Sequence, residues 1–260
     1  MARTRGTHTA LAGGRAEWPG QVLSHAGLAD VLECAAAGLV RRGLRAGDAV
    51  GVYVPDAASY VVAIHAILAA GGVPSPASAC ASAARVAEQL TQSGARILIT
   101  ASPLTDLALE AADGSRVRQV ISFEDAPGTT PFSALLGKGR REAAGGRRSD
   151  PALVLYRQGV GGWFGCEAVS HAAMAGELAR LAASSPLSAS DVVLAAPPAG
   201  DCLDYTIVVN LALLCGGTVA AVPGDDMGGA AMKHCGTAAV AHPGMSVPSG
   251  LALRVVGTSR

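Results

Sequence analysis

The chain has 260 residues, of which 50% are hydrophobic and 15% charged, and its formal net charge is zero. This length and apolar content suffice for one large hydrophobic core or two smaller ones. Because the charges balance and only 3% of the residues are aromatic, the composition excludes the basic and stacking surfaces of a nucleic-acid-binding protein, and also electrostatic attachment to an anionic membrane.

The sequence was also searched for a secretory segment, a membrane span and cysteine motifs. No secretory segment follows the basic start at residues 1–15, and the longest apolar stretches are interrupted by polar and glycine residues, so we expect a folded cytoplasmic protein without a membrane span. The six cysteines form no C-x-x-C pair and no Cys-His cluster at zinc spacing. We therefore expect reduced, mostly buried thiols and no metal site.

Helix-period and strand-period segments alternate along the chain, which predicts an α/β fold of mostly parallel sheets flanked by helices. The predicted elements, in chain order, are a helix at 28–39, a strand at 49–54, a helix after Asp56, a helix at 82–92, a strand at 96–100, a helix at 103–112, strands at 117–122 and 152–155, a helix at 170–183, a strand at 191–196, a helix at 205–215, a strand at 218–222 and short strands near Ala238 and Arg254. Gly43 is placed to end the first helix, and Asp56 to cap the second.

The same reading predicts the domain organisation. Residues 1–20 are expected to form a flexible N-terminus. Residues 21–260 are expected to form one α/β domain, divisible into two subdomains, with a long Gly-, Pro- and Arg-rich surface loop near 123–150.

The most informative segment runs from Tyr156 to Cys166 and reads YRQGVGGWFGC. A loop that holds nucleotide phosphates needs glycines for close backbone approach, hydroxyl groups that donate to phosphate oxygens, and usually a lysine. The glycines are Gly159, Gly161, Gly162 and Gly165. Between Tyr156 and His171, no Ser or Thr precedes Ser170 and no Lys is present. The sequence therefore predicts a degenerate phosphate loop and no nucleotide cofactor.

Several short segments carry a resemblance to a known family. They are Val54-Pro55-Asp56, Ala69-Ala70-Gly71-Gly72, Ala87-Glu88-Gln89-Leu90, Ser93-Gly94-Ala95-Arg96, Asp150-Pro151-Ala152, Ser170-His171, Asp191-Val192-Val193-Leu194, Asn210-Leu211-Ala212-Leu213-Leu214 and Leu253-Arg254-Val255-Val256-Gly257. In this order they resemble the N-terminal part of the adenylate-forming acyl- and aryl-CoA ligases (the ANL superfamily), closest to the 4-coumarate:CoA ligase type. The resemblance runs from roughly residue 24 to the last residue and implies the fold of that region.

The departures from the family pattern bear on activity. The family loop reads Tyr-Ser-Ser-Gly-Thr-Thr-Gly-x-Pro-Lys-Gly, and its hydroxyl, Pro and Lys places are filled here by Arg157, Gln158, Val160, Gly161, Phe164 and Gly165. The next landmark, Leu-Pro-x-Phe-His, whose aromatic residue and His help to wall the acyl pocket, reads Pro197-Pro198-Ala199-Gly200-Asp201. The family's acidic Mg/ATP motif, ribose-binding Asp and C-terminal lid with the catalytic Lys have no counterpart before Arg260. The resemblance thus implies a truncated chain that is not an ATP-dependent ligase.

Trp163 and Phe164 stand out because the chain has only nine aromatic residues: two Trp, four Tyr and three Phe. Two interpretations are open. The rings fold inward and plug the space that a nucleotide would occupy, or they point outward and anchor a partner, since a buried Trp carries a large share of interface energy.

A rival hypothesis is a repurposed non-ligase enzyme of the cyclase or isomerase type. If the alignment holds, Asp201, His171 and Glu167 lie around the former nucleotide and acyl pockets, together with Cys202, Asp204 and Tyr205. A carboxylate and an imidazole within hydrogen-bond reach can transfer a proton. Each residue also has a structural interpretation, because Ser170-His171 opens a helix in the family and Asp201 and Asp204 can be solvated loop acids.

These features favour a catalytically inactive, ligase-like pseudoenzyme with a binding or assembly role. By family analogy, its setting is bacterial specialised metabolism, such as acyl, aryl or polyketide antibiotic biosynthesis, in a GC-rich actinomycete whose 20 basic residues include only two lysines, Lys138 and Lys233. Because a truncated chain exposes apolar surface, we expect a homodimer or a pathway protein as partner. A small aryl or acyl ligand is compatible with this role.

Overall fold

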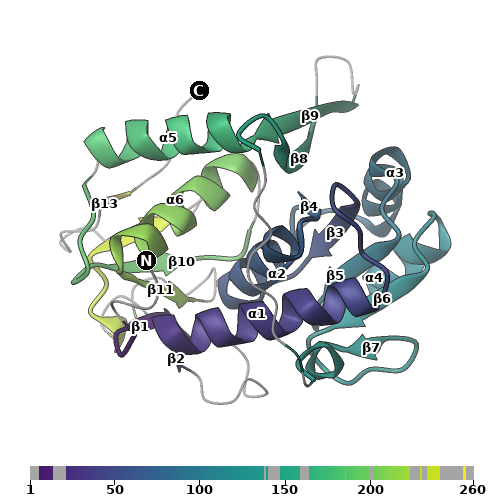
Figure 1. The fold of residues 1–260 in the computed structure, drawn as a ribbon, viewed down its shortest axis with the longest axis horizontal. Coiled ribbons are helices and arrows are strands. Elements are labelled where there is room, and N and C mark those ends of the chain that lie inside the picture. The colour runs from purple at the N-terminus through teal and green to yellow at the C-terminus, as the bar shows by residue number, and fades with distance from the viewer. Residues whose placement is uncertain are drawn as a thin grey trace. The chain divides into compact units, whose positions relative to one another are not determined.

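The computed structural model describes residues 6–13, 22–137, 139, 147–158, 164–184, 186–198, 202–222, 229, 233–240 and 254–255. Over these ranges the fold is α/β, with largely parallel sheets and flanking helices, which confirms the predicted fold class (Figure 1). The chain forms two compact units. Unit 1 comprises residues 1–29, 56–61 and 175–260, and unit 2 comprises residues 30–55 and 62–174.

Unit 2 is built on a five-stranded, fully parallel sheet with the order β4-β3-β5-β6-β7. The strands are β3 (Ala49–Tyr53), β4 (Val73–Pro76), β5 (Ile97–Thr100), β6 (Gln119–Ser122) and β7 (Thr130–Pro131). The helices that connect them are α2 (Ala57–Ala70), of which residues 57–61 belong to unit 1, α3 (Ala83–Ser93) and α4 (Thr105–Asp113). The central strands are buried on both faces, as expected of a parallel sheet covered by helices.

Helix α3 packs on this sheet through a glycine in the central strand. Val86 and Leu90 of α3 are buried in one apolar cluster with Leu98 of β5. A side chain at Gly51 of β3 would collide with the Leu90 side chain and lie 2.9 Å from a methyl group of Leu98. Glycine at position 51 therefore allows the helix to approach the sheet closely.

The predicted helix boundaries follow from recognisable capping residues. The Asp56 carboxylate accepts hydrogen bonds from the Ser59 N–H at 2.9 Å and from the Ser59 hydroxyl at 2.7 Å, which confirms Asp56 as the cap of α2. Gly94 ends α3 in the left-handed conformation, with φ of 68°. The first helix, α1 (His25–Arg41), is longer than predicted and is followed by Gly43 with φ of 95°.

The segment expected to be a surface loop, residues 123–150, contains ordered structure. Strand β7 pairs with β6, and a short 3₁₀ helix, η2 (Phe132–Leu135), follows it with Phe132 and Leu135 buried. The Phe132 ring stacks on that of Phe123 with centroids 4.3 Å apart. Arg41 of α1 donates to the Leu135 carbonyl at 3.1 Å. The sequence analysis missed these contacts because the Gly- and Pro-rich composition suggested a loop, whereas Phe132 and Leu135 pack into the core.

Unit 1 contains a six-stranded sheet with the order β13-β12-β10-β11-β1-β2, parallel except for the β1–β2 pair. The strands are β1 (Thr9–Ala12), β2 (Val22–Ser24), β10 (Val192–Ala195), β11 (Thr218–Ala221), β12 (Ala238–Val240) and β13 (Arg254–Val255). The sequence analysis assigned no element to β1 or β2. The helices are α5 (His171–Ser184), which begins in unit 2, and α6 (Cys202–Cys215).

Within the described part of the chain, no helix has the length and apolar character needed to cross a membrane.

Two glycine substitutions test how tightly η2 packs on α1. Adding a methyl group at Gly38 of α1 places it 2.6 Å from the Leu135 Cα atom, whereas Gly176 of α5 has open space around it. We expect Gly38→Ala to destabilise the protein by about 1–3 kcal/mol through overpacking. Gly176→Ala should instead stabilise it by about 0.5–1 kcal/mol, the usual helix gain of Ala over Gly. Chemical denaturation measures both, and equal effects of the two substitutions would refute the packing argument.

Candidate functional site

The degenerate loop of the sequence lies between two antiparallel strands of unit 2, β8 (Pro151–Gln158) and β9 (Phe164–Ser170). Their register places Tyr156 opposite Cys166 and Leu155 opposite Glu167. Residues 159–163, which include Gly159, Gly161, Gly162 and Trp163, lie outside the described residues. Gly165 is an exposed residue of β9 with open space where a side chain would begin.

The two strands differ in burial. Ala152, Leu153 and Leu155 of β8 are buried, and β8 contacts β4 of the unit 2 sheet. Residues 165–168 of β9 are all exposed. The hairpin is thus anchored by β8. The sequence analysis predicted β8 as a shorter strand and missed β9, whose residues show no alternation of apolar and polar side chains.

Tyr156 is the unusual residue of the hairpin. Its hydroxyl oxygen is buried and makes no hydrogen bond of good geometry with the described residues, although the Cys166 thiol and the Ser93 hydroxyl lie near enough to affect its pKa. Burial raises the pKa of this phenol above its usual value of 10.0, and the Cys166 thiol beside it raises the pKa further. The hydroxyl therefore stays protonated at neutral pH, where it can donate a hydrogen bond but cannot act as a base.

Helix α5 begins directly after β9. The Ala173 N–H donates to the Ser170 hydroxyl at 3.1 Å, so Ser170 caps the helix, and the His171 N–H donates to the Asp150 carbonyl at 3.0 Å. The His171 side chain is half-buried, and that of Glu167 is exposed. Within the described part of the chain, no hydrogen bond or ion pair joins these two side chains. Asp201, the third residue of the predicted acid–base set, lies outside the described residues, so this set remains a prediction.

In unit 1, the carboxyl end of β10 is the place where an α/β sheet of this topology usually binds ligands. Strand β11 lies on one side of β10 and β12 on the other, so the connections diverge there. The Tyr205 hydroxyl of α6 donates to the carbonyl of Ala196, the residue after β10, at 2.8 Å. Tyr205 is 5% exposed, so its ring covers this strand end.

A buried polar network lies beside this strand end. The Tyr60 hydroxyl and the Thr206 hydroxyl are 2.7 Å apart, and Thr206 donates to the Cys202 carbonyl at 2.5 Å. The Tyr60 ring meets the Tyr205 ring edge-on, with centroids 5.0 Å apart. Helices α2 and α6 are thereby joined inside unit 1 by two phenols and one hydroxyl. Sequence analysis named Tyr205 as a site residue but missed Tyr60, because its partner is 146 residues away.

The electrostatics of this network fit packing better than proton transfer. Burial raises the pKa of Tyr205 well above 10.0, and the negative charges of Asp56 and the Cys202 thiolate form would raise it further. A phenol held neutral in this way can donate a hydrogen bond but cannot act as a base near neutral pH.

The described residues were also compared with the predictions for metal ligands and cysteines. They contain no group of three or more His, Cys, Asp or Glu side chains arranged to hold a metal ion. All six cysteines are free thiols, but the prediction that they are mostly buried is wrong, since only Cys202 is buried. Cys80, Cys166 and Cys235 are exposed because they lie in turns or at the outer strand of the hairpin.

The two parallel sheets and the hairpin define an α/β protein of the kind found in adenylate-forming enzymes. The family model described as AMP-binding enzyme matches residues 1–245, and the chain belongs to this family. No curated protein matches the sequence significantly.

Solved structures agree with this assignment. MbtA of Mycobacterium smegmatis is 26% identical with a TM-score of 0.80 over 92% of this chain and 46% of its own. A long-chain-fatty-acid-CoA ligase (FadD1) of Archaeoglobus fulgidus is 22% identical with a TM-score of 0.79, covering 93% of this chain and 50% of its own. A benzoate CoA ligase of Burkholderia xenovorans LB400 is 20% identical with a TM-score of 0.76, covering 96% and 52%. The chain thus spans about half the length of these structures.

Removal of the Tyr156 hydroxyl tests whether that buried oxygen lacks a partner. Because Tyr156→Phe removes an unsatisfied polar atom and keeps the ring, we expect unchanged stability or a gain of up to about 1 kcal/mol. The matched control is Tyr60→Phe, which removes a satisfied hydroxyl and should cost about 1 kcal/mol. Urea denaturation compares the two, and a loss in Tyr156→Phe as large as that in Tyr60→Phe would show that the Tyr156 hydroxyl is bonded.

Tyr205 makes the protein sensitive to alkali. Its pKa in the folded chain lies above the unfolded value of 10.0, so its contribution to stability is complete below pH 10 and is lost as the pH rises above it. The expected slope is about 1.4 kcal/mol per pH unit for one proton. Tyr205→Phe should lose stability at neutral pH but decline less steeply above pH 10. Denaturation at neutral and alkaline pH measures this, and parallel declines in both proteins would contradict it.

Proposed function

We propose that this protein is a catalytically inactive member of the AMP-binding enzyme family with a binding or assembly role in bacterial specialised metabolism of acyl, aryl or polyketide compounds. The observation that carries the proposal is the composition of the segment between β8 and β9. From Arg157 to Gly165 it offers four glycines but no Ser, Thr or Lys side chain.

The missing groups matter because a triphosphate is strongly charged. One lysine ammonium at about 4 Å from a phosphate oxygen contributes roughly 4 kcal/mol at the effective dielectric constant of a protein surface. Each hydrogen bond from a hydroxyl to a charged oxygen adds about 1.5–3 kcal/mol. Losing the lysine and several hydroxyls together forfeits enough free energy to reduce nucleotide affinity by many orders of magnitude.

The binding role follows from what the chain retains. Family membership and the α/β scaffold support this role, because the chain keeps a folded core while its sequence lacks the phosphate-binding side chains of the family loop. A folded scaffold without its chemistry can still present surfaces to a partner or a small acyl or aryl ligand. The long-chain-fatty-acid-CoA ligase and the benzoate CoA ligase act on acyl and aryl acids according to their names, which supports that ligand class by analogy.

Restoring the family loop tests the proposal directly. The variant replaces Arg157 and Gln158 by Ser, Val160 and Gly161 by Thr, Phe164 by Pro, Gly165 by Lys and Cys166 by Gly. We expect MgATP to leave the Tm of the natural chain unchanged and to raise the Tm of the restored variant, because a ligand that binds only the folded state stabilises it by mass action.

Pyrophosphate release with aryl and acyl acids is measured on the same samples. Formation of an acyl-adenylate by the natural chain, or a rise in its Tm with MgATP, would contradict the proposal. A rise in Tm with an aryl acid alone supports the binding role. If MgATP does not raise the Tm of the restored variant, the loop composition alone does not account for the absence of nucleotide binding. Gly165→Ser, which adds one hydroxyl at an open position, is a mild control for disturbance of the hairpin.

A further inference from the structure

Three arginines meet at the amino-terminal edge of the unit 2 sheet. Arg96 directly precedes β5 and Arg118 directly precedes β6, and these two strands pair in parallel. The Arg118 N–H donates to the Arg96 carbonyl at 2.9 Å, so the two backbones are in contact. Arg116 lies two residues earlier, and all three residues are exposed. We call Arg96, Arg116 and Arg118 the arginine edge.

The arginine edge has no internal counter-charge. None of its three guanidinium groups forms an ion pair or a hydrogen bond with any residue that the structure describes. Asp48, which precedes β3 at the same edge, accepts the N–H of Arg45 at 2.9 Å. Asp113, at the end of α4, makes no ion pair with Arg116.

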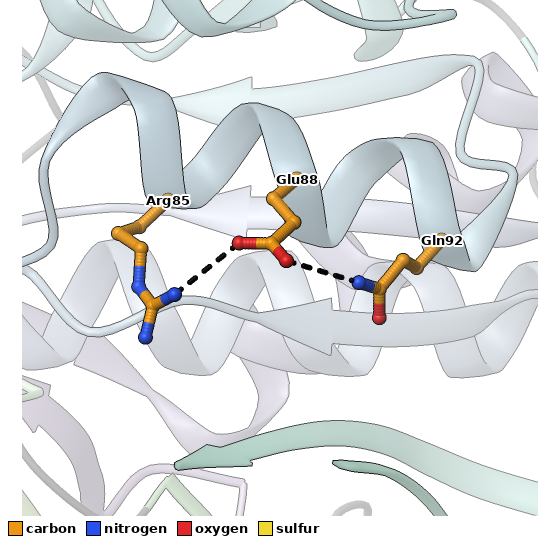
Figure 2. Close-up of polar contacts among 3 residues, drawn as sticks. All are labelled: Arg85, Glu88 and Gln92. Carbon is orange, nitrogen blue, oxygen red and sulfur yellow. Dashed lines mark hydrogen bonds and ion pairs between the residues drawn. The ribbon is translucent and has the colours of Figure 1, made fainter. Parts of the chain in front are cut away.

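A half-buried arginine of the same unit, Arg85, shows the contrast. Figure 2 shows Arg85 of α3 donating to the Glu88 carboxylate at 3.2 Å, while Gln92 donates to the other oxygen of Glu88 at 3.3 Å. That charge is balanced within its own helix. Arg96 and Arg118, in contrast, are like charges on adjacent strands, an arrangement that does not stabilise the fold and that favours an external anion.

Three kinds of anion could bind the arginine edge: a small anion, a nucleic acid or an acidic polypeptide. A single small anion at an exposed surface gains at most about 1 kcal/mol per contact, too little for occupancy at ordinary concentrations. Nucleic acid binding depends on many phosphate contacts, which a chain with zero net charge does not supply. Several carboxylates on one polypeptide bind together, each guanidinium taking one carboxylate in a bidentate fork.

We propose that the arginine edge docks an acidic segment of a partner polypeptide. This goes beyond the proposed function, because the three arginines lie apart in sequence from the degenerate loop and the docking holds whether or not the protein adenylates a substrate.

The test measures fluorescence anisotropy of a labelled glutamate-rich peptide with the full chain, and the same peptide with glutamine in place of glutamate is the uncharged control. We expect binding of the glutamate peptide alone, weakening as salt screens the charges. Arg96→Gln with Arg118→Gln should lower the affinity about tenfold or more. The matched control, Arg85→Gln, makes the same kind of change at a paired arginine and should alter the affinity less than about twofold.

Four outcomes would overturn the proposal: no binding of the glutamate peptide, equal binding of the glutamine peptide, equal loss in Arg85→Gln, or displacement of the peptide by millimolar inorganic phosphate, which would indicate a small-anion site. Thermal unfolding checks that the variants are folded. If the double variant does not fold, Arg116→Gln decides, because this residue is exposed and outside the strands. The affinity of the Arg116→Gln variant for the glutamate peptide should fall severalfold.

Discussion

Burial of the parallel strands of unit 2 determines where this protein can carry chemistry. Strands β4 and β5 are buried at every position, and in such strands a polar side chain must find a partner within the sheet or lie at a strand end. The three buried polar residues of the unit 2 strands obey this rule. Ser75 accepts from Gln89, Thr100 donates to the Tyr53 carbonyl, and Ser122 donates to Glu124. Outside this sheet, the Thr105 and Tyr156 hydroxyls are buried without such a partner among the described residues.

The two edges then differ in character. At carboxyl ends, polar groups are turned inward and hydrogen-bonded, as when the Tyr205 hydroxyl donates to the Ala196 carbonyl in unit 1 and when one oxygen of the Glu124 carboxylate accepts the Ser102 N–H in unit 2. At the amino end of the unit 2 sheet, the guanidinium groups of Arg96 and Arg118 face solvent without a partner among the described residues. An α/β protein usually presents its reactive groups at the carboxyl edge. Here the described carboxyl ends are occupied by the chain's own side chains.

Sequence reasoning succeeded where structure is local. The helices at α2 and α3 could be predicted because a cap, an apolar stripe and a terminating glycine lie within one segment, as Asp56 and Gly94 illustrate. It failed where pairing is distant. Strand β1 is short and pairs with β11, about 200 residues away, and η2 is fixed by its contact with Gly38 of another helix. The Tyr60–Thr206 bond was missed for the same reason, since no pattern in either helix reveals a partner 146 residues away.

Under the proposed function, family membership and phosphate binding separate because they depend on different residues. The core tolerates substitution as long as side chains remain apolar and of similar volume, so a fold survives at 20–26% identity. Phosphate-binding side chains contribute nothing to that core. Gly165 has open space around it, and the neighbouring positions of β9 are exposed, so neither packing nor burial selects for hydroxyl or ammonium groups there. At these positions, hydroxyl and ammonium groups would serve only to bind a ligand. Once nucleotide binding is no longer required, these positions can change without cost to folding, while buried residues such as Leu153 and Leu155 of β8 remain constrained by packing.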